Sequence, residues 1–99
     1  MSVSNNGWSN KRGTSDRVCK CGSWANHWVK FNAAKQSWPK QCAVEGCSSQ
    51  PDVGGHVIHP DATGERIVPL CNSCNGLSSK FNLKPGTQIP SANVTNTCG

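Results

Sequence analysis

The sequence has few of the residues that build a large hydrophobic core. Among its 99 residues there is no Tyr, there are two Phe and one Met, and 34% of the chain is hydrophobic. A chain of this length forms one domain and buries a modest fraction of its surface, so such domains often need a cross-link or a bound metal. The seven cysteines are the obvious material for that purpose.

Long apolar runs are also missing. The sequence contains no stretch long enough to span a membrane, and its first residues lack the apolar segment of a signal peptide. We therefore expect a cytoplasmic protein with no membrane partner. In that reducing environment cysteines serve as metal ligands more often than as disulfides, and the odd cysteine count with two closely spaced pairs favours ligands as well.

Acidic residues are scarce, and the charge is distributed unevenly. Residues 1–40 carry seven basic residues and one acidic residue, a net charge of +6, whereas residues 41–99 carry three basic and four acidic residues, a net charge of −1. A basic half favours a nucleic-acid partner through phosphate neutralisation, although the same charges can simply keep a protein soluble. The candidate contacts, with one tryptophan that could stack on a base, are Lys11, Arg12, Arg17, Lys20, Lys35, Trp38 and Lys40.

Two cysteine pairs have the spacing of a zinc site. Cys42 and Cys47 are separated by four residues that include Gly46, and Cys71 and Cys74 form a Cys-x-x-Cys pair. Such pairs let four thiolates reach one tetrahedral zinc ion from two tight turns. A second metal site could be built from Cys19 and Cys21, completed by His27, His59 or Cys98. The alternative is a turn without metal, with His27 packed among aromatic residues.

The hydrophobic pattern predicts two helices and one hairpin. Ser23 is a suitable N-cap for a helix from Trp24 to about Asn32, whose aromatic residues repeat at helical spacing. Two β-rich runs, 55–58 and 66–70, flank a turn at 60–64 and predict a hairpin. A second helix should begin near Asn72 and carry Cys74, Leu77 and Phe81. These elements divide the chain into a flexible basic arm (1–18) in which only Trp8 could dock on the body, a single zinc-binding domain (19–84) and a loose tail (85–99).

The strings Gly-His-Val-Ile-His-Pro at 55–60 and Ile-Val-Pro-Leu-Cys-Asn-Ser-Cys-Asn at 67–75 resemble the HNH endonuclease family. The resemblance covers residues 42–82 and implies a small, zinc-stabilised α+β module of the treble-clef (ββα-metal) type, here with an N-terminal helical extension. It also implies His56 as the general base, Asn75 beside a catalytic divalent cation such as Mg²⁺, and a structural zinc held by Cys42, Cys47, Cys71 and Cys74.

The sequence departs from the family at two active-site positions. Gly55 stands where the family usually has a cation-binding Asp or His, and Glu65 and Arg66 occupy the region of its middle asparagine. His59, Asp61 or Glu65 could supply the missing ligand. Three functions therefore stay open: a metal-dependent endonuclease acting on nucleic acid, most simply DNA; a non-catalytic zinc module that binds nucleic acid; and a module that binds a protein partner, as a small inhibitor or adaptor would.

Overall fold

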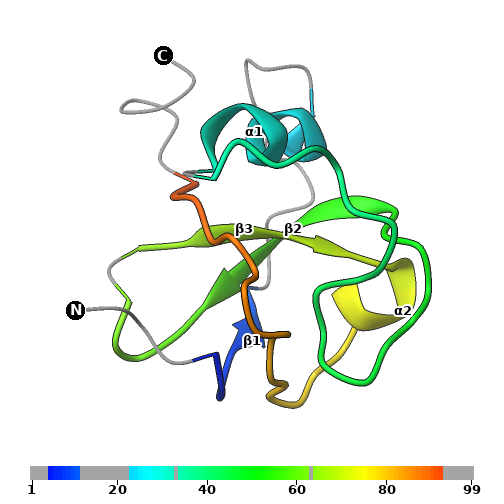
Figure 1. The fold of residues 1–99 in the computed structure, drawn as a ribbon. Helices are drawn as coiled ribbons and strands as arrows, with labels where there is room; N and C mark the ends of the chain where they lie inside the picture. The colour runs from blue at the N-terminus through cyan, green and yellow to red at the C-terminus, as the bar shows by residue number, and fades with distance from the viewer. Residues whose placement is uncertain (1–4, 12–22, 33, 63, 93–99) are drawn as a thin grey trace.

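A computed structural model describes residues 5–11, 23–32, 34–62 and 64–92 of the protein. Within these residues the fold is a small α+β arrangement of a three-stranded antiparallel sheet and two helices (Figure 1). The strands are β1 (Ser9–Asn10), β2 (Val53–Ile58) and β3 (Arg66–Leu70), with β2 in the centre. Helix α1 (Trp24–Phe31) lies over the sheet, and the short α2 (Asn72–Asn75) follows β3 directly.

Helix α1 forms where the sequence predicted it. The Ser23 hydroxyl accepts a hydrogen bond from the Asn26 backbone N–H at 3.1 Å, which satisfies one of the free N–H groups of the first turn. At the other end the buried Asn32 amide donates to the carbonyls of Trp28 and Val29 and closes the helix. Of the residues that repeat at helical spacing, His27 and Trp28 are buried, and Trp24 and Phe31 are partly buried.

The predicted hairpin is also confirmed. Strands β2 and β3 pair from Val57 opposite Arg66 to Val53 opposite Leu70. On one face of this hairpin His56 packs against α1, which lies directly on the strand at Gly54. A Cβ atom at Gly54 would lie 2.5 Å from the Trp24 carbonyl carbon, so this position requires glycine.

The opposite face of the sheet carries the main hydrophobic core. Alternation along the strands directs Val57, Val68 and Leu70 to this face, away from α1. These side chains pack in one cluster with Trp8, Ala43, Val44, Phe81, Leu83 and three buried cysteines, Cys42, Cys71 and Cys74. Three of the cysteines are therefore part of the main hydrophobic core.

Helix α2 is shorter than predicted, and the expectation that it would carry Leu77 and Phe81 was wrong. The helix ends at Asn75, and Gly76 follows as its C-cap. Phe81 instead pairs with Trp8, the two exchanging backbone hydrogen bonds of 2.8 and 2.9 Å. Pairing with a segment far away in the sequence thus replaces the local helix.

Parts of the predicted arm and tail pack against the body of the protein. Ser9 and Asn10 pair with β2, and the Asn10 side-chain amide donates to the carbonyls of Cys74 and Leu77. On the far side, β3 is covered by the segment 88–92, where the Ile67 N–H donates to the Pro90 carbonyl and the Ala92 N–H to the Glu65 carbonyl, each at 2.9 Å. Both edges of the β2–β3 hairpin therefore gain hydrogen-bond partners that they would otherwise lack.

Replacing Trp8 with Ala should lower the free energy of unfolding by about 3–5 kcal/mol, because the side chain is 1% exposed and packs in the main core. Urea denaturation followed by circular dichroism would measure the change. The matched control is Val29→Ala on the exposed side of α1, and Trp8→Phe is the milder variant should Trp8→Ala fail to fold. A loss no larger than that of Val29→Ala would contradict the burial of Trp8 in the core.

Candidate metal centre

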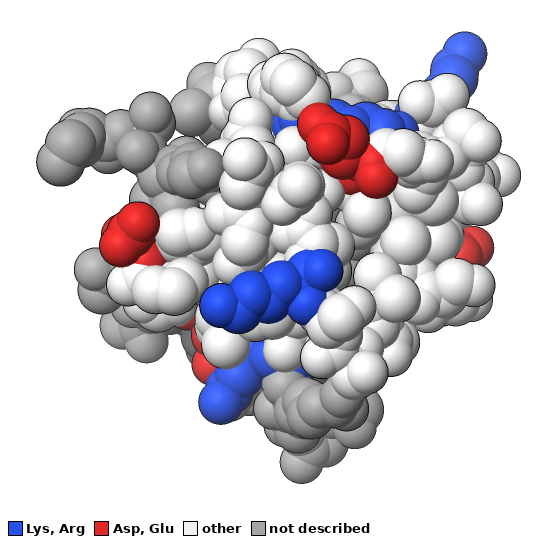
Figure 2. Space-filling model, turned by 90° about the horizontal axis from the view of Figure 1, so that it is seen from below, with Lys and Arg blue, Asp and Glu red and all other residues white. Residues whose placement is uncertain are grey.

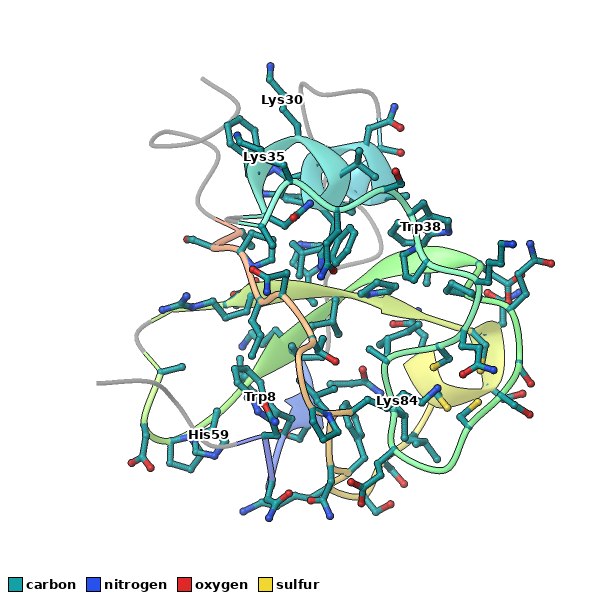
Figure 3. The ribbon with its side chains drawn as sticks, viewed as in Figure 1. Trp8, Lys30, Lys35, Trp38, His59 and Lys84 are labelled. Atoms are coloured by element: carbon teal, nitrogen blue, oxygen red, sulfur yellow. The ribbon has the colours of Figure 1, made fainter. Side chains whose placement is uncertain are left out.

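Four cysteine side chains, from two loops that the core brings together, form one cluster. The sulfur atoms of Cys42, Cys47, Cys71 and Cys74 all lie within 4.8 Å of one another, and those of Cys47 and Cys71 are 3.8 Å apart. All four are free thiols. Figure 3 draws the sulfur atoms beside α2, at the end of the sheet.

The first cysteine pair is held in a tight turn, residues 42–47, that is closed by its own hydrogen bond and fixed by two neighbouring segments. The Cys47 N–H donates to the Val44 carbonyl at 3.0 Å, and Gly46 takes the positive φ of 87° that the turn requires. The Ala43 N–H donates to the Pro69 carbonyl in β3, and the Glu45 N–H to the Asn82 carbonyl, each at 2.8 Å. These hydrogen bonds hold the turn against the strand that leads to the second pair.

The second pair is positioned by the junction of β3 and α2. Cys71 is the N-cap of α2, and its sulfur accepts a hydrogen bond from the Cys74 N–H at 3.5 Å. The N–H of Asn72, the first residue of the helix, donates to the Asp52 carboxylate at 2.9 Å. The first turn of the helix therefore directs both thiols to the same point, and a thiol and a carboxylate accept two of its free N–H groups.

The thiols differ in how readily they lose a proton. A hydrogen bond from the Ser49 backbone lowers the pKa of Cys47 to about 7. Burial, followed by the neighbouring thiols, raises the pKa of Cys74, and burial also raises that of Cys42. Because a metal ion binds thiolates, it has to displace the protons of the buried thiols, so binding releases protons and strengthens as the pH rises.

A lysine lies directly beside the cluster. The Lys84 ammonium group donates to the Cys47 carbonyl at 2.5 Å and to the Gln41 side-chain carbonyl at 3.1 Å (Figure 3). Four thiolates around a divalent cation carry a net charge of −2, and a fixed positive charge nearby offsets part of it. Sequence reasoning missed this residue, since Lys84 lies beyond both cysteine motifs.

The arrangement fits a structural zinc ion. Zn–S bonds of about 2.3 Å in a tetrahedron place the sulfur atoms about 3.8 Å apart, which is the separation of the Cys47 and Cys71 sulfurs. Four sulfur donors with no oxygen donor suit zinc and are unsuited to Mg²⁺ or Ca²⁺. The four cysteines are thus positioned to hold a metal ion, consistent with structural zinc.

The predicted second metal site involves residues that the structure describes only in part. Cys19, Cys21 and Cys98 lie outside the described residues. His27 is buried, and its Nε2 lies 2.7 Å from the Ser91 carbonyl oxygen, a hydrogen-bonding distance. The ring also contacts those of Trp24 and Phe31. The geometry of His27 therefore matches the aromatic packing that was the alternative to metal binding.

The two predicted catalytic residues are not brought together. The His56 ring is 5% exposed and meets the Trp24 ring edge-on at 4.3 Å, on the α1 face of the sheet. Asn75 is exposed on α2, and its side-chain oxygen lies 2.9 Å from where a Cβ of Gly55 would be, on the other face. Strand β2 runs between them, because adjacent residues of a strand point to opposite faces.

Position 55 has no space for a cation ligand in this conformation. A Cβ there would lie 2.4 Å from Leu70 Cδ1. The proposed substitute His59 uses both ring nitrogens: Nδ1 accepts from the Asp61 N–H at 3.0 Å, and Nε2 donates to the Asn6 carbonyl at 2.9 Å. Its ring also packs against Trp8 (Figure 3), so His59 fastens the N-terminal segment to the hairpin. The other two proposed substitutes are Asp61, which is exposed in the turn after β2, and Glu65. The Glu65 backbone carbonyl accepts a hydrogen bond from the Ala92 N–H beside β3.

The candidate nucleic-acid contacts are spread over the surface. Lys35 lies close to the end of α1, and Trp38 is half-buried with its ring edge-on to that of Trp28 (Figure 3). Lys11 and Lys40 are exposed, on the edge of the sheet and before the cysteine turn respectively. Seen from below, the molecule shows separate basic and acidic groups among uncharged residues (Figure 2). Arg12, Arg17 and Lys20 lie outside the described residues.

Comparisons of the sequence and structure with protein-family models, with curated proteins and with solved structures find no match. Neither helix of the described part is long and apolar enough to cross a membrane.

Removing the metal should unfold most of the protein, because three of the four ligands belong to the main core and structural zinc contributes about 10–16 kcal/mol of apparent binding energy in small modules. A strong chelator should abolish the near-ultraviolet circular dichroism of the tryptophans, and added zinc should restore it. Cys74→Ser should greatly weaken zinc binding, whereas Ser73→Ala, next to it on the exposed side of α2, should retain the metal. A chelated protein with unchanged tryptophan signals would contradict a structural role for the metal.

Proposed function

We propose that this protein is a zinc-stabilised, treble-clef module of the HNH type that binds nucleic acid without cleaving it. The observation that carries the proposal is a four-thiol cluster at the end of a hairpin that separates His56 from Asn75. A cysteine turn, a hairpin and a cysteine pair that opens a helix follow one another in the treble-clef order. The metal would then support the fold, with no part in a reaction.

Charge supports nucleic acid as the partner. The described residues of the N-terminal half include four lysines and no acidic residue, and the whole half has a net charge of +6. A small module with this charge binds phosphates by displacing their counterions. Lys11, Lys35 and Lys40 remain the proposed contacts. Trp38 mainly packs within the protein, because it is half-buried against Trp28.

Burial argues against catalysis by His56. A general base must reach the water that it activates, directly or through one further water. The His56 ring is 5% exposed beneath α1, and Gly55 adds no ligand for a divalent cation. HNH-type cleavage would require both groups at one place.

The zinc-loaded protein should therefore leave supercoiled plasmid intact when Mg²⁺, Mn²⁺ or Ni²⁺ is added. Agarose gels of plasmid incubated with a stoichiometric excess of protein would test this, with a known HNH nuclease as the positive control. Nicking that needs the added cation and disappears in a His56→Gln variant with unchanged zinc content would overturn the non-catalytic assignment.

Binding to nucleic acid should weaken steeply with salt. If about four cations contact phosphates, the affinity for duplex DNA should fall about 100-fold between about 50 and about 200 mM salt. Fluorescence anisotropy with a labelled oligonucleotide would measure this. Lys35→Glu should weaken binding more than Lys80→Glu, a matched exposed lysine outside the basic half. Absence of binding to both duplex and single-stranded DNA at low salt would refute the proposed function.

A further inference from the structure

A cleft lies between two segments that are distant in the sequence. Residues 36–43, which connect α1 to the cysteine turn, form one wall, and residues 84–87 form the other. Trp28 and Pro69 contribute to its lining, and its volume is about 330 Å³. This volume is at the lower end of the range for small-molecule sites, and it suits one planar group such as a nucleobase.

The lining combines apolar surface with positive charge. Pro39 and Pro85 supply its accessible apolar surface, whereas Trp28 and Pro69, which also line it, are almost fully buried. Its charged residues are two lysines, Lys40 and Lys84, and no lining residue carries a carboxylate. The occupant that complements such a site has an apolar, planar part and a negative charge.

The two lysines differ in how they are held. Lys84 is fixed by its hydrogen bonds to Gln41 and to the Cys47 carbonyl. An ammonium group has three N–H donors, so it can direct one more towards a bound oxygen. Lys40 is exposed and free to follow a phosphate along the rim. Lys84 therefore provides a fixed position for a negatively charged group of the ligand, and Lys40 adds a second positive charge at the rim.

Other groups in the lining suit a base edge. Gln36 and Gln41 present side-chain amides, which can both donate and accept hydrogen bonds, and Thr87 lies on the opposite wall. Every base has an apolar face, so packing of that face against Pro39 and Pro85 would tolerate different sequences. Bases of an intact duplex are stacked and paired and cannot enter a cleft of this kind.

We infer that this cleft is a subsite for one nucleotide of single-stranded nucleic acid, with the base against the prolines and the phosphate near Lys40 and Lys84. The inference rests on the proposed function and makes it more specific. It places the contact on the α1 side of the molecule, between residues 36–43 and 84–87. It also predicts that single strands bind more tightly than duplexes of the same sequence.

The test uses the full-length, zinc-loaded protein and a fluorescein-labelled oligothymidine, alone or annealed to its complement, in anisotropy titrations at low salt. The single strand should bind more tightly than the duplex. Lys40→Glu should weaken single-strand binding about tenfold or more. The matched control Lys30→Glu reverses the same charge in the same half of the chain, on a part of α1 that does not line the cleft, and should cost less than about threefold.

The outcomes separate the two proposals. No binding of either oligonucleotide by the unaltered protein refutes the proposed function itself. Binding that favours the duplex, or equal losses in Lys40→Glu and Lys30→Glu, retains the proposed function and refutes the cleft as its site. Zinc content and thermal unfolding of each variant, measured alongside, establish that a loss of affinity is not a loss of fold.

Discussion

The convergence of four thiols at the end of the hairpin is the constraint on which the rest of this structure depends. Cys42 and Cys47 enter from a turn held by β3, and Cys71 and Cys74 from the junction of β3 and α2. Three of these side chains are also part of the main core. A metal ion bound by these thiols would therefore reinforce the hydrophobic packing, which suits a small domain with few large apolar residues.

The sheet that leads to this cluster also separates the residues that an HNH-type reaction would use. It divides the molecule into an α1 face, where His56 and Gly54 lie beneath the helix, and a core face, which leads to α2 and the cysteines. An HNH-type reaction needs a base and a cation ligand on the same side. Here the close contacts of α1 with Gly54 and of Trp24 with His56 bury the histidine, and among the described residues Asn75 lies on the other face of the sheet.

The same helix contributes to the surface that we assign to the ligand. Trp28, on the buried face of α1, donates its indole N–H to the Gln88 carbonyl at 2.8 Å and so fixes the segment that follows Lys84. Asn32 accepts the Gln36 N–H at 2.7 Å and fixes the start of the opposite wall. The walls of the cleft are thus held by side chains of α1 and its C-cap, while Lys84 links one of them to the cysteine turn.

The sequence by itself determined the local elements and the metal ligands. Ser23 marks the start of α1, the turn residues at 60–64 mark the hairpin, and the spacing within each cysteine pair marks a pair of candidate ligands, because each of these features depends on neighbouring residues alone. Only the tertiary structure decided the pairing of Trp8 with Phe81, the covering of β3 by residues 88–92 and the separation of His56 from Asn75. These contacts join residues far apart in the chain, and their hydrogen bonds and packing leave no periodic pattern in the sequence.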